Sequence, residues 1–183
     1  MSKRLAVPGA RLLEPDPWRG LAALDLKLLR LLRTRGHTPF VERAAIRLAQ
    51  SGENGALWNA VAVAGGALSA RRREDYVRAI EAVLLTLLLN TVVKQTVRRA
   101  RPVLEDELPA LTPVLSGRSY PSAHASTSFA GARALAAAGL PGPPLHAVAF
   151  AMALSRPYLG VHYPSDVVAG ALLGDSVARL MSR

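Results

Sequence analysis

The chain has 183 residues, a length that suits a single domain, and half of them are hydrophobic although the formal net charge is +10. It contains no cysteine, which excludes disulfides and thiolate metal sites. An apolar and basic chain suits an anionic membrane, because each nearby Lys or Arg gains roughly 1 kcal/mol from the surface potential, whereas nucleic acid matches the charge alone, so we expect no nucleic-acid partner.

Residues 1–50 are predicted to hold an irregular segment followed by two helices. Residues 1–17 contain three prolines and mixed charge, and they lack the apolar core of a signal peptide. Residues 18–35 place leucines on one helical face and basic residues mostly on the other; these are Leu21, Leu24, Leu28, Leu31 and Leu32, and Lys27, Arg30 and Arg33. A second helix is expected over 39–50. The pattern over 18–50 is typical of amphipathic helices in a membrane interface, with a surface helix on a soluble core as the alternative.

Residues 54–183 are predicted to form the core as a bundle of about five helices. Their expected ranges are 54–70, 74–97, 123–139, 142–156 and 165–181. Arg133 and Asp175 interrupt two of these ranges, and none is an uncharged run of about 20 residues, the length that a lone membrane-spanning helix needs. Small residues, as in VVAGALLGDS, let membrane helices pack closely with their charges turned inward. We therefore expect an all-α, membrane-embedded helical bundle, and a soluble all-α bundle is the alternative.

Successive crossings of this bundle would bring three polar segments to the same end. The segments are KQTVRRARP at 94–102, PSAH at 121–124 and SRPYLGVHYPSD at 155–166. The basic run Arg71 to Arg73 and the C-terminus would lie at the other end. Basic residues are more numerous at the end that holds the polar segments, which predicts that this end faces the cytoplasm.

His162 and Asp166 are candidate catalytic residues because they are one helical turn apart at the start of a predicted helix. A carboxylate at this spacing can accept the hydrogen bond of one imidazole nitrogen. The bond fixes the tautomer and leaves the other nitrogen as a nucleophile. A solvated aspartate beside an unrelated histidine is the alternative interpretation.

The PSAH segment is a candidate anion site because a helix begins there, and the free N–H groups of a helix N-terminus bind anions. Ser122 and the amide of Ala123 can donate to phosphate oxygens. His124 can protonate a leaving oxygen, since an imidazole titrates near neutrality. Helix capping explains Ser122 equally well, but it leaves His124 unexplained.

Lys94, Arg101 and Arg156 supply fixed positive charge at the end of the bundle where the three polar segments meet. A phosphoryl group in transfer carries negative charge on its equatorial oxygens, and prepositioned cations in a pocket of low dielectric stabilise that charge. Arginine binds two oxygens in a fork, whereas lysine acts as a point charge. Arg98 and Arg99 are predicted to be an ordinary basic helix end that meets lipid headgroups.

The three motifs, in this order, resemble those of the type-2 phosphatidic acid phosphatase superfamily, which also includes vanadium haloperoxidases. Ala123 stands where the family motif has glycine, and alanine still offers its N–H. The resemblance implies that His162 is the nucleophile and forms a phosphohistidine, that Asp166 supports it, and that His124 protonates the leaving group and then activates water. It further implies a phosphate site and no metal or other cofactor. The phosphate-binding residues would be Lys94, Arg101, Ser122, Ala123 and Arg156.

The segments RGHTPF and SGENGALW resemble the decaprenylphosphoryl-phosphoribose phosphatases within this superfamily. That resemblance implies a polyprenyl-linked phosphosugar of cell-wall synthesis as the lipid-linked phosphate substrate. Undecaprenyl diphosphate and phosphatidylglycerol phosphate are rival substrates. A soluble phosphatase or haloperoxidase and a non-catalytic basic membrane-binding protein are rival functions. Helix faces rich in Gly and Ala also leave room for a homo-oligomer.

Overall fold

A computed structural model describes residues 19–102, 110–113 and 117–182, and the predicted irregular segment 1–17 lies outside them. The described residues form an all-α fold, as expected. The α-helices are α1 (Arg19–Thr34), α2 (Pro39–Ser51), α3 (Ala56–Leu68), α4 (Arg73–Val97), α5 (Ala123–Ala137), α6 (Gly142–Tyr158) and α7 (Pro164–Met181), with 3₁₀ turns η1 (Glu53–Gly55) and η2 (Ala70–Arg72). Each helix lies within a few residues of its predicted range.

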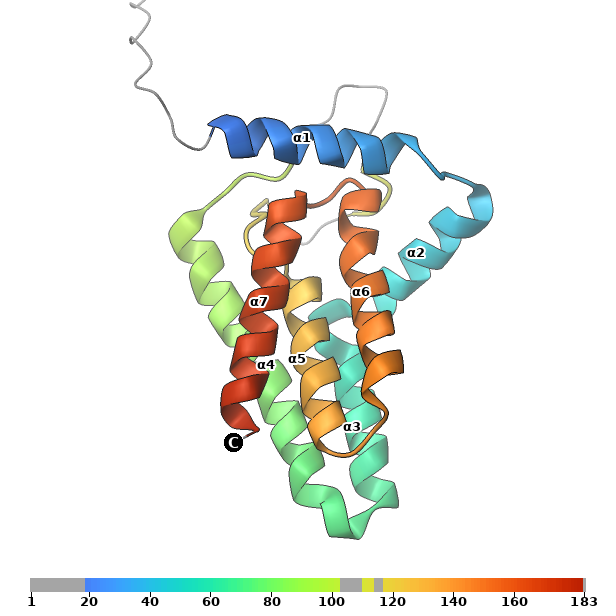
Figure 1. The fold of residues 1–183 in the computed structure, drawn as a ribbon, viewed down its shortest axis with the longest axis vertical. Helices are drawn as coiled ribbons and strands as arrows, with labels where there is room; N and C mark the ends of the chain where they lie inside the picture. Colours follow the sequence, from blue (N-terminus) through green and yellow to red (C-terminus); the bar gives the residue numbers. More distant parts are fainter. Residues whose placement is uncertain (1–18, 103–109, 114–116, 183) are drawn as a thin grey trace, which may run out of the picture.

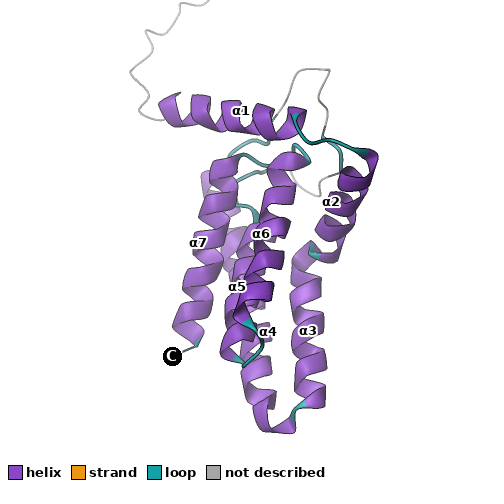
Figure 2. Ribbon diagram, turned by 45° about the vertical axis from the view of Figure 1, so that its right-hand side comes forward, coloured by secondary structure: helices purple, strands orange, loops and turns teal. Residues whose placement is uncertain are grey.

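Helices α3 to α7 run side by side, and α1 lies across one end of this bundle (Figures 1 and 2). Helix α5 occupies the middle and packs against α3, α4, α6 and α7. Most of its alanines, both of its serines and its glycine are buried, because small side chains allow the neighbouring backbones to approach. A Cβ atom at Gly174 of α7 would collide with the backbone of α5, and one at Gly170 would collide with the backbone of Ser122, the N-cap of α5. The small residues therefore position the starts of α5 and α7 against each other.

The outer surface of the bundle is apolar along several helices. Exposed large side chains include Leu84, Leu88 and Val92 on α4, Phe150 and Leu154 on α6, and Val168 and Leu172 on α7. Within the described residues one stretch, Ala70–Val97, has the length and composition of a membrane-crossing helix, and 33% of its apolar window is buried inside the protein. The two charges that interrupt the predicted helices, Arg133 and Asp175, bond to each other between α5 and α7.

Helix α1 turns a mixed stripe toward the bundle. Asp25, Leu29 and Arg33 are buried. Arg33, which was predicted to lie mostly on the face away from the leucines, packs with Asp25 and Leu29 against the end of the bundle. The exposed apolar face of α1 comprises Leu21, Leu24, Leu28 and Leu31, of which Leu24 is 52% exposed.

Candidate active site

A cavity of about 390 Å³ lies at the end of the bundle that α1 crosses. Residues from six parts of the chain line it. The predicted site residues among them are Lys94 at the end of α4, Arg101 in the next loop, Ala123 and His124 at the start of α5, Arg156 near the end of α6, and His162 in the loop before α7. The alternating directions of α4 to α7 thus carry all three polar segments to one place.

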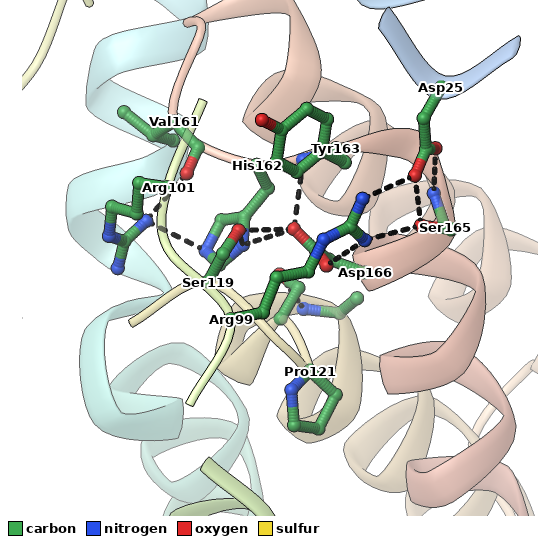
Figure 3. Close-up of polar contacts among 12 residues, drawn as sticks. Asp25, Arg99, Arg101, Ser119, Pro121, Val161, His162, Tyr163, Ser165 and Asp166 are labelled. Carbon is green, nitrogen blue, oxygen red and sulfur yellow. Dashed lines mark hydrogen bonds and ion pairs between the residues drawn. The ribbon is translucent and has the colours of Figure 1, made fainter. Parts of the chain in front are cut away.

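His162 is held by oxygen atoms on one side of its ring (Figure 3). The side chain is 3% exposed, and its Nδ1 lies 3.6 Å from Asp166 Oδ2 and 3.5 Å from Ser119 Oγ. Two acceptors beside Nδ1 favour the tautomer that carries its proton there. The lone pair is then on Nε2, which lies 3.1 Å from Nη1 of Arg101 at the cavity. This arrangement suits Nε2 as a nucleophile.

Asp166 is itself fixed by several donors. Its Oδ2 accepts a hydrogen bond from the backbone N–H of Tyr163 at 2.9 Å and another from the hydroxyl of Ser119. The bond from Tyr163 is half of a capping box that begins α7, because Asp166 is the third residue of that helix. The same hydrogen bonds that start the helix therefore aim the carboxylate at His162.

Burial lowers the pKa of the His162 imidazole from 6.5 to about 3. The cations of the cavity act in the same direction, and the hydrogen bond with Asp166 opposes both. The folded protein therefore keeps the ring neutral throughout the neutral range, and the ring gains a proton only as the pH falls toward 3. A neutral ring keeps its lone pair for attack on phosphorus.

We accordingly expect the ring nitrogens of His162 to show the neutral form from pH 8 down to pH 5, on the basis of that lowered pKa. Nitrogen NMR of the ring-labelled protein in detergent would follow them, with the His162→Gln variant used to assign the signals. A midpoint near 6.5 for this ring would contradict the expectation.

His124, the second residue of α5, also lines the cavity. Its Nε2 donates to the backbone carbonyl of Ala49 in α2 at 2.9 Å, which leaves Nδ1 to exchange a proton with a ligand. Gly52, just after α2, packs against the same histidine, because a Cβ there would lie 3.3 Å from the His124 ring. Helix α2 therefore sets the ring's orientation.

The three predicted cations surround the cavity. Lys94 Nζ donates to the carbonyl of Pro121 at 2.8 Å, which ties the end of α4 to the segment that starts α5. Arg101 Nη1 donates to the carbonyl of Val161 at 2.6 Å beside the nucleophile. Arg156 is buried, and its Nε has no hydrogen-bond partner among the described residues. Such a concentration of buried and half-buried positive charge suits an anion with several oxygens.

The family model of the PAP2 superfamily matches residues 75–183, which include all three motifs. The chain belongs to the PAP2 superfamily. It is a PAP2 phosphatase, a hydrolase of phosphoric monoesters, as the sequence analysis predicted.

Two relatives carry the name decaprenylphosphoryl-5-phosphoribose phosphatase. The chain is 40% identical over 134 residues to the one from Mycolicibacterium smegmatis, and the alignment covers 72% of each chain. It is 37% identical over 140 residues to the one from Mycobacterium tuberculosis, and this alignment covers 73% of this chain and 75% of the relative.

Two solved structures share the fold. The crystal structure of Aquifex aeolicus LpxE matches with a TM-score of 0.73 at 27% identity, over 86% of this chain and 94% of that one. A transmembrane PAP2 type phosphatidylglycerolphosphate phosphatase from Bacillus subtilis matches with a TM-score of 0.73 at 22% identity, over 89% of this chain and 85% of that one. The second likeness concerns the fold alone.

Ser122 has a different place in this PAP2 site from the other predicted phosphate ligands. It is fully buried and is not among the described residues that line the cavity. Its Oγ accepts from the N–H of Ala125 at 3.4 Å, and its own N–H donates to the carbonyl of Asp166 at 2.9 Å. The hydroxyl caps α5 and the amide ties α5 to α7.

We expect Ser122→Ala to lower kcat by about tenfold or less and to cost about 1 kcal/mol of stability, since the lost interaction is a helix cap. Kinetics and thermal unfolding in detergent would measure both. A loss of kcat beyond about a thousandfold would instead indicate a direct contact with the reacting phosphate.

The prediction for Arg99 was wrong. Rather than meeting lipid headgroups, its Nη1 donates to Asp166 Oδ1 at 2.8 Å and its Nη2 donates to Asp25 Oδ2 at 2.7 Å (Figure 3). Its guanidinium also lies 4.1 Å from the ring centre of Tyr163. Arg98 is exposed, and its Nε donates to the carbonyl of Gln95.

Sequence reasoning missed Ser119, Asp25 and Arg99 as parts of the PAP2 site. Ser119 belongs to no motif and gave no signal. Asp25 is the single acidic residue among 18–35, in a segment otherwise apolar and basic, and an acid so placed is a signal that could have been used.

Proposed function

We propose that this phosphatase removes the terminal phosphate of a polyprenyl-linked phosphosugar of the decaprenylphosphoryl-5-phosphoribose type. The observation that carries the proposal is the 40% identity, over 72% of the chain, to a relative of that name. The reaction would proceed through a phosphohistidine, and the geometry of His162 supports this route.

In the first step the phosphate occupies the cavity among Lys94, Arg101 and Arg156. Arg101 turns from Nε2 of His162 to a phosphate oxygen, which frees the lone pair. Nε2 attacks phosphorus, and the bond from phosphorus to the sugar oxygen breaks with its electrons on that oxygen. His124, protonated on Nδ1, gives the leaving oxygen a proton. Asp166 stabilises the positive charge that the ring of His162 acquires.

In the second step the phosphate is transferred to water. His124 now lacks the proton that it donated, so it accepts one from a water molecule whose oxygen attacks phosphorus. The bond between phosphorus and Nε2 breaks, and its electrons return to the ring of His162. Inorganic phosphate leaves, and both histidines regain their starting forms.

Uncharged and acidic polar residues also line the cavity, and they support a sugar as the neighbouring group. They are Glu53, Asn54, Thr91 and Gln95. A carboxylate repels a phosphate but accepts hydrogen bonds from sugar hydroxyls, and amide and hydroxyl side chains can both donate and accept. Glu53 and Asn54 lie on η1, the turn that joins α2 to α3 within the SGENGALW segment.

A substrate panel tests the proposal. The detergent-purified protein would be given decaprenylphosphoryl-5-phosphoribose, undecaprenyl diphosphate and phosphatidylglycerol phosphate, and phosphate release would be measured. We expect the highest kcat/KM for the phosphosugar, by about a hundredfold if its hydroxyls meet polar groups built for them. A higher value for either rival would replace the proposed substrate.

We also propose that the bundle is embedded in a membrane with the cavity on the cytoplasmic side. A buried helix of a soluble protein hides most of its apolar surface, whereas most of the apolar window of α4 is not buried. Lys27, Arg43 and Arg47 add exposed positive charge at the cavity end, which favours the cytoplasm.

Extraction by detergent but not by salt or alkali would support embedding. A reporter fused after Arg183 should read as external, and a cytoplasmic reading would overturn the orientation.

Vanadate should inhibit the enzyme and chelators should not. Vanadate adopts the five-coordinate geometry of the transferring phosphoryl group, so it would bind among the same cations and histidines. The superfamily resemblance implies a reaction without metal. Steady-state inhibition by vanadate and assays in excess EDTA would check both halves. Loss of activity in EDTA that added metal restores would point to a metal-dependent phosphatase.

A further inference from the structure

Asp25 of α1 is a buried carboxylate with an unusual set of partners. Its side chain is 3% exposed. Oδ1 accepts from the backbone N–H of Ser165 at 2.9 Å, and Oδ2 accepts from Arg99 Nη2 at 2.7 Å and from the hydroxyl of Ser165. A buried charge persists when it is paired and hydrogen-bonded in this way. Asp25 lies outside residues 75–183, the part that the family model matches.

Arg99 connects this carboxylate to the site. One face of its guanidinium lies over Tyr163, and its two terminal nitrogens point to different acids, Asp25 and Asp166 (Figure 3). Nη1 is also 2.7 Å from the hydroxyl of Ser165. The guanidinium is therefore held at both ends, and α1, the loop after α4 and the start of α7 meet at this one group.

The bond from Arg99 holds the second oxygen of the Asp166 carboxylate. Oδ1 accepts from Arg99 at 2.8 Å, while Oδ2, which the capping bond of α7 also holds, faces Nδ1 of His162. Without Asp25, Arg99 would keep one acidic partner only and could swing about it. Its uncompensated charge would then draw more strongly on Asp166, which would hold the proton of His162 less well.

We propose that Asp25 is a positioning residue for catalysis, acting through Arg99 on Asp166. It fixes the guanidinium, which fixes Oδ1 of Asp166 and keeps Oδ2 on the imidazole of His162. Helix α1 is then part of the machinery that aims the nucleophile, besides being a helix with an exposed leucine face. This inference rests on the proposed roles of His162 and Asp166. An aspartate that merely anchors α1 to the bundle is the competing explanation.

A double-mutant cycle separates the two explanations. Asp25→Asn keeps the shape but removes the charge, and we expect kcat to fall about tenfold with KM unchanged, because Asp25 does not touch the substrate. Arg99→Ala should lower kcat at least as much. The double variant should be no worse than Arg99→Ala alone, since both changes break the same path.

Asp175→Asn is the matched control, because it removes the charge of another aspartate that pairs with an arginine, in this case Arg133 across the contact between α5 and α7. It should leave kcat unchanged, and thermal unfolding of both asparagine variants would show whether they are equally folded. If Asp25→Asn does not fold, Arg99→Lys tests the same path, since a lysine cannot bridge two carboxylates in a fork. The expected result is again a lower kcat at constant KM.

The inference is overturned if Asp25→Asn, or Arg99→Lys in its place, has the kcat of the wild type. It is also overturned if the losses from Asp25→Asn and Arg99→Ala multiply in the double variant, which indicates two separate effects. His162→Ala, assayed alongside, distinguishes failure of the proposed function from failure of this inference. Activity in His162→Ala refutes the assignment of the nucleophile. An inactive His162→Ala together with a fully active Asp25→Asn refutes the positioning role alone.

Discussion

Replacement of His162 by alanine should reduce phosphate release by at least about ten-thousandfold, the loss seen when a covalent nucleophile is removed. The reason is that no other described nitrogen has the same placement, with Nδ1 beside the oxygens of Asp166 and Ser119 and Nε2 at the cavity. The lost step is formation of the bond between nitrogen and phosphorus. Phosphate release by the detergent-purified variant, at saturating substrate, measures the effect.

His146→Ala is the control for this change. His146 lies near the start of α6, at the opposite end of the bundle, where its Nδ1 bonds to the carbonyl of Gly142. It should keep wild-type activity. The rival view of a non-catalytic basic membrane-binding protein expects no difference between the two variants, so comparable function in both would favour that view.

Asp166→Asn should lower kcat by about a thousandfold to ten-thousandfold. An amide in place of this carboxylate presents an N–H where Nδ1 of His162 needs an acceptor, and the wrong tautomer is then favoured. The substitution also leaves Arg99 with one acidic partner, Asp25, instead of two. Because Asp166 acts on the nucleophile rather than on the substrate, KM should change much less than kcat. Steady-state kinetics in detergent distinguish the two parameters.

The Asp175→Asn variant again provides the comparison, since it lies on the same helix and also loses an ion pair. An Asp166→Asn enzyme with kcat within tenfold of the wild type would show that the tautomer of His162 does not depend on this carboxylate. The aspartate would then be unrelated to the function of the histidine, as in the alternative interpretation of their spacing.

The helices could be predicted well because proline and glycine punctuate the chain. Thr38 caps α2 ahead of Pro39, and Pro164 occupies the first turn of α7 as expected. One departure is at α6, which continues two residues beyond its predicted end to Tyr158, with Pro157 inside its last turn. The proline lies so near the helix end that it breaks little of the hydrogen-bond ladder.

The site could be predicted where a motif carries the chemistry and not where tertiary contacts supply it. Lys94, His124 and His162 belong to short sequence motifs. The alternating directions of the predicted helices bring these motifs to the same end of the bundle. Arg99 and Asp25 are 74 residues apart, and their pairing depends on how α1 lies across the bundle, which no local pattern encodes. Ser122 is the opposite case. It belongs to a motif, but in the structure its hydroxyl caps α5.

The covalent intermediate can be sought directly. The enzyme would be mixed with phosphosugar labelled in its terminal phosphate, quenched in base within its first turnovers, and digested for mass spectrometry. We expect the label on the imidazole of residue 162 in wild type and none on the His162→Ala protein. Label on a different residue, or product formed with no phosphoprotein at any time, would contradict the mechanism proposed for this enzyme.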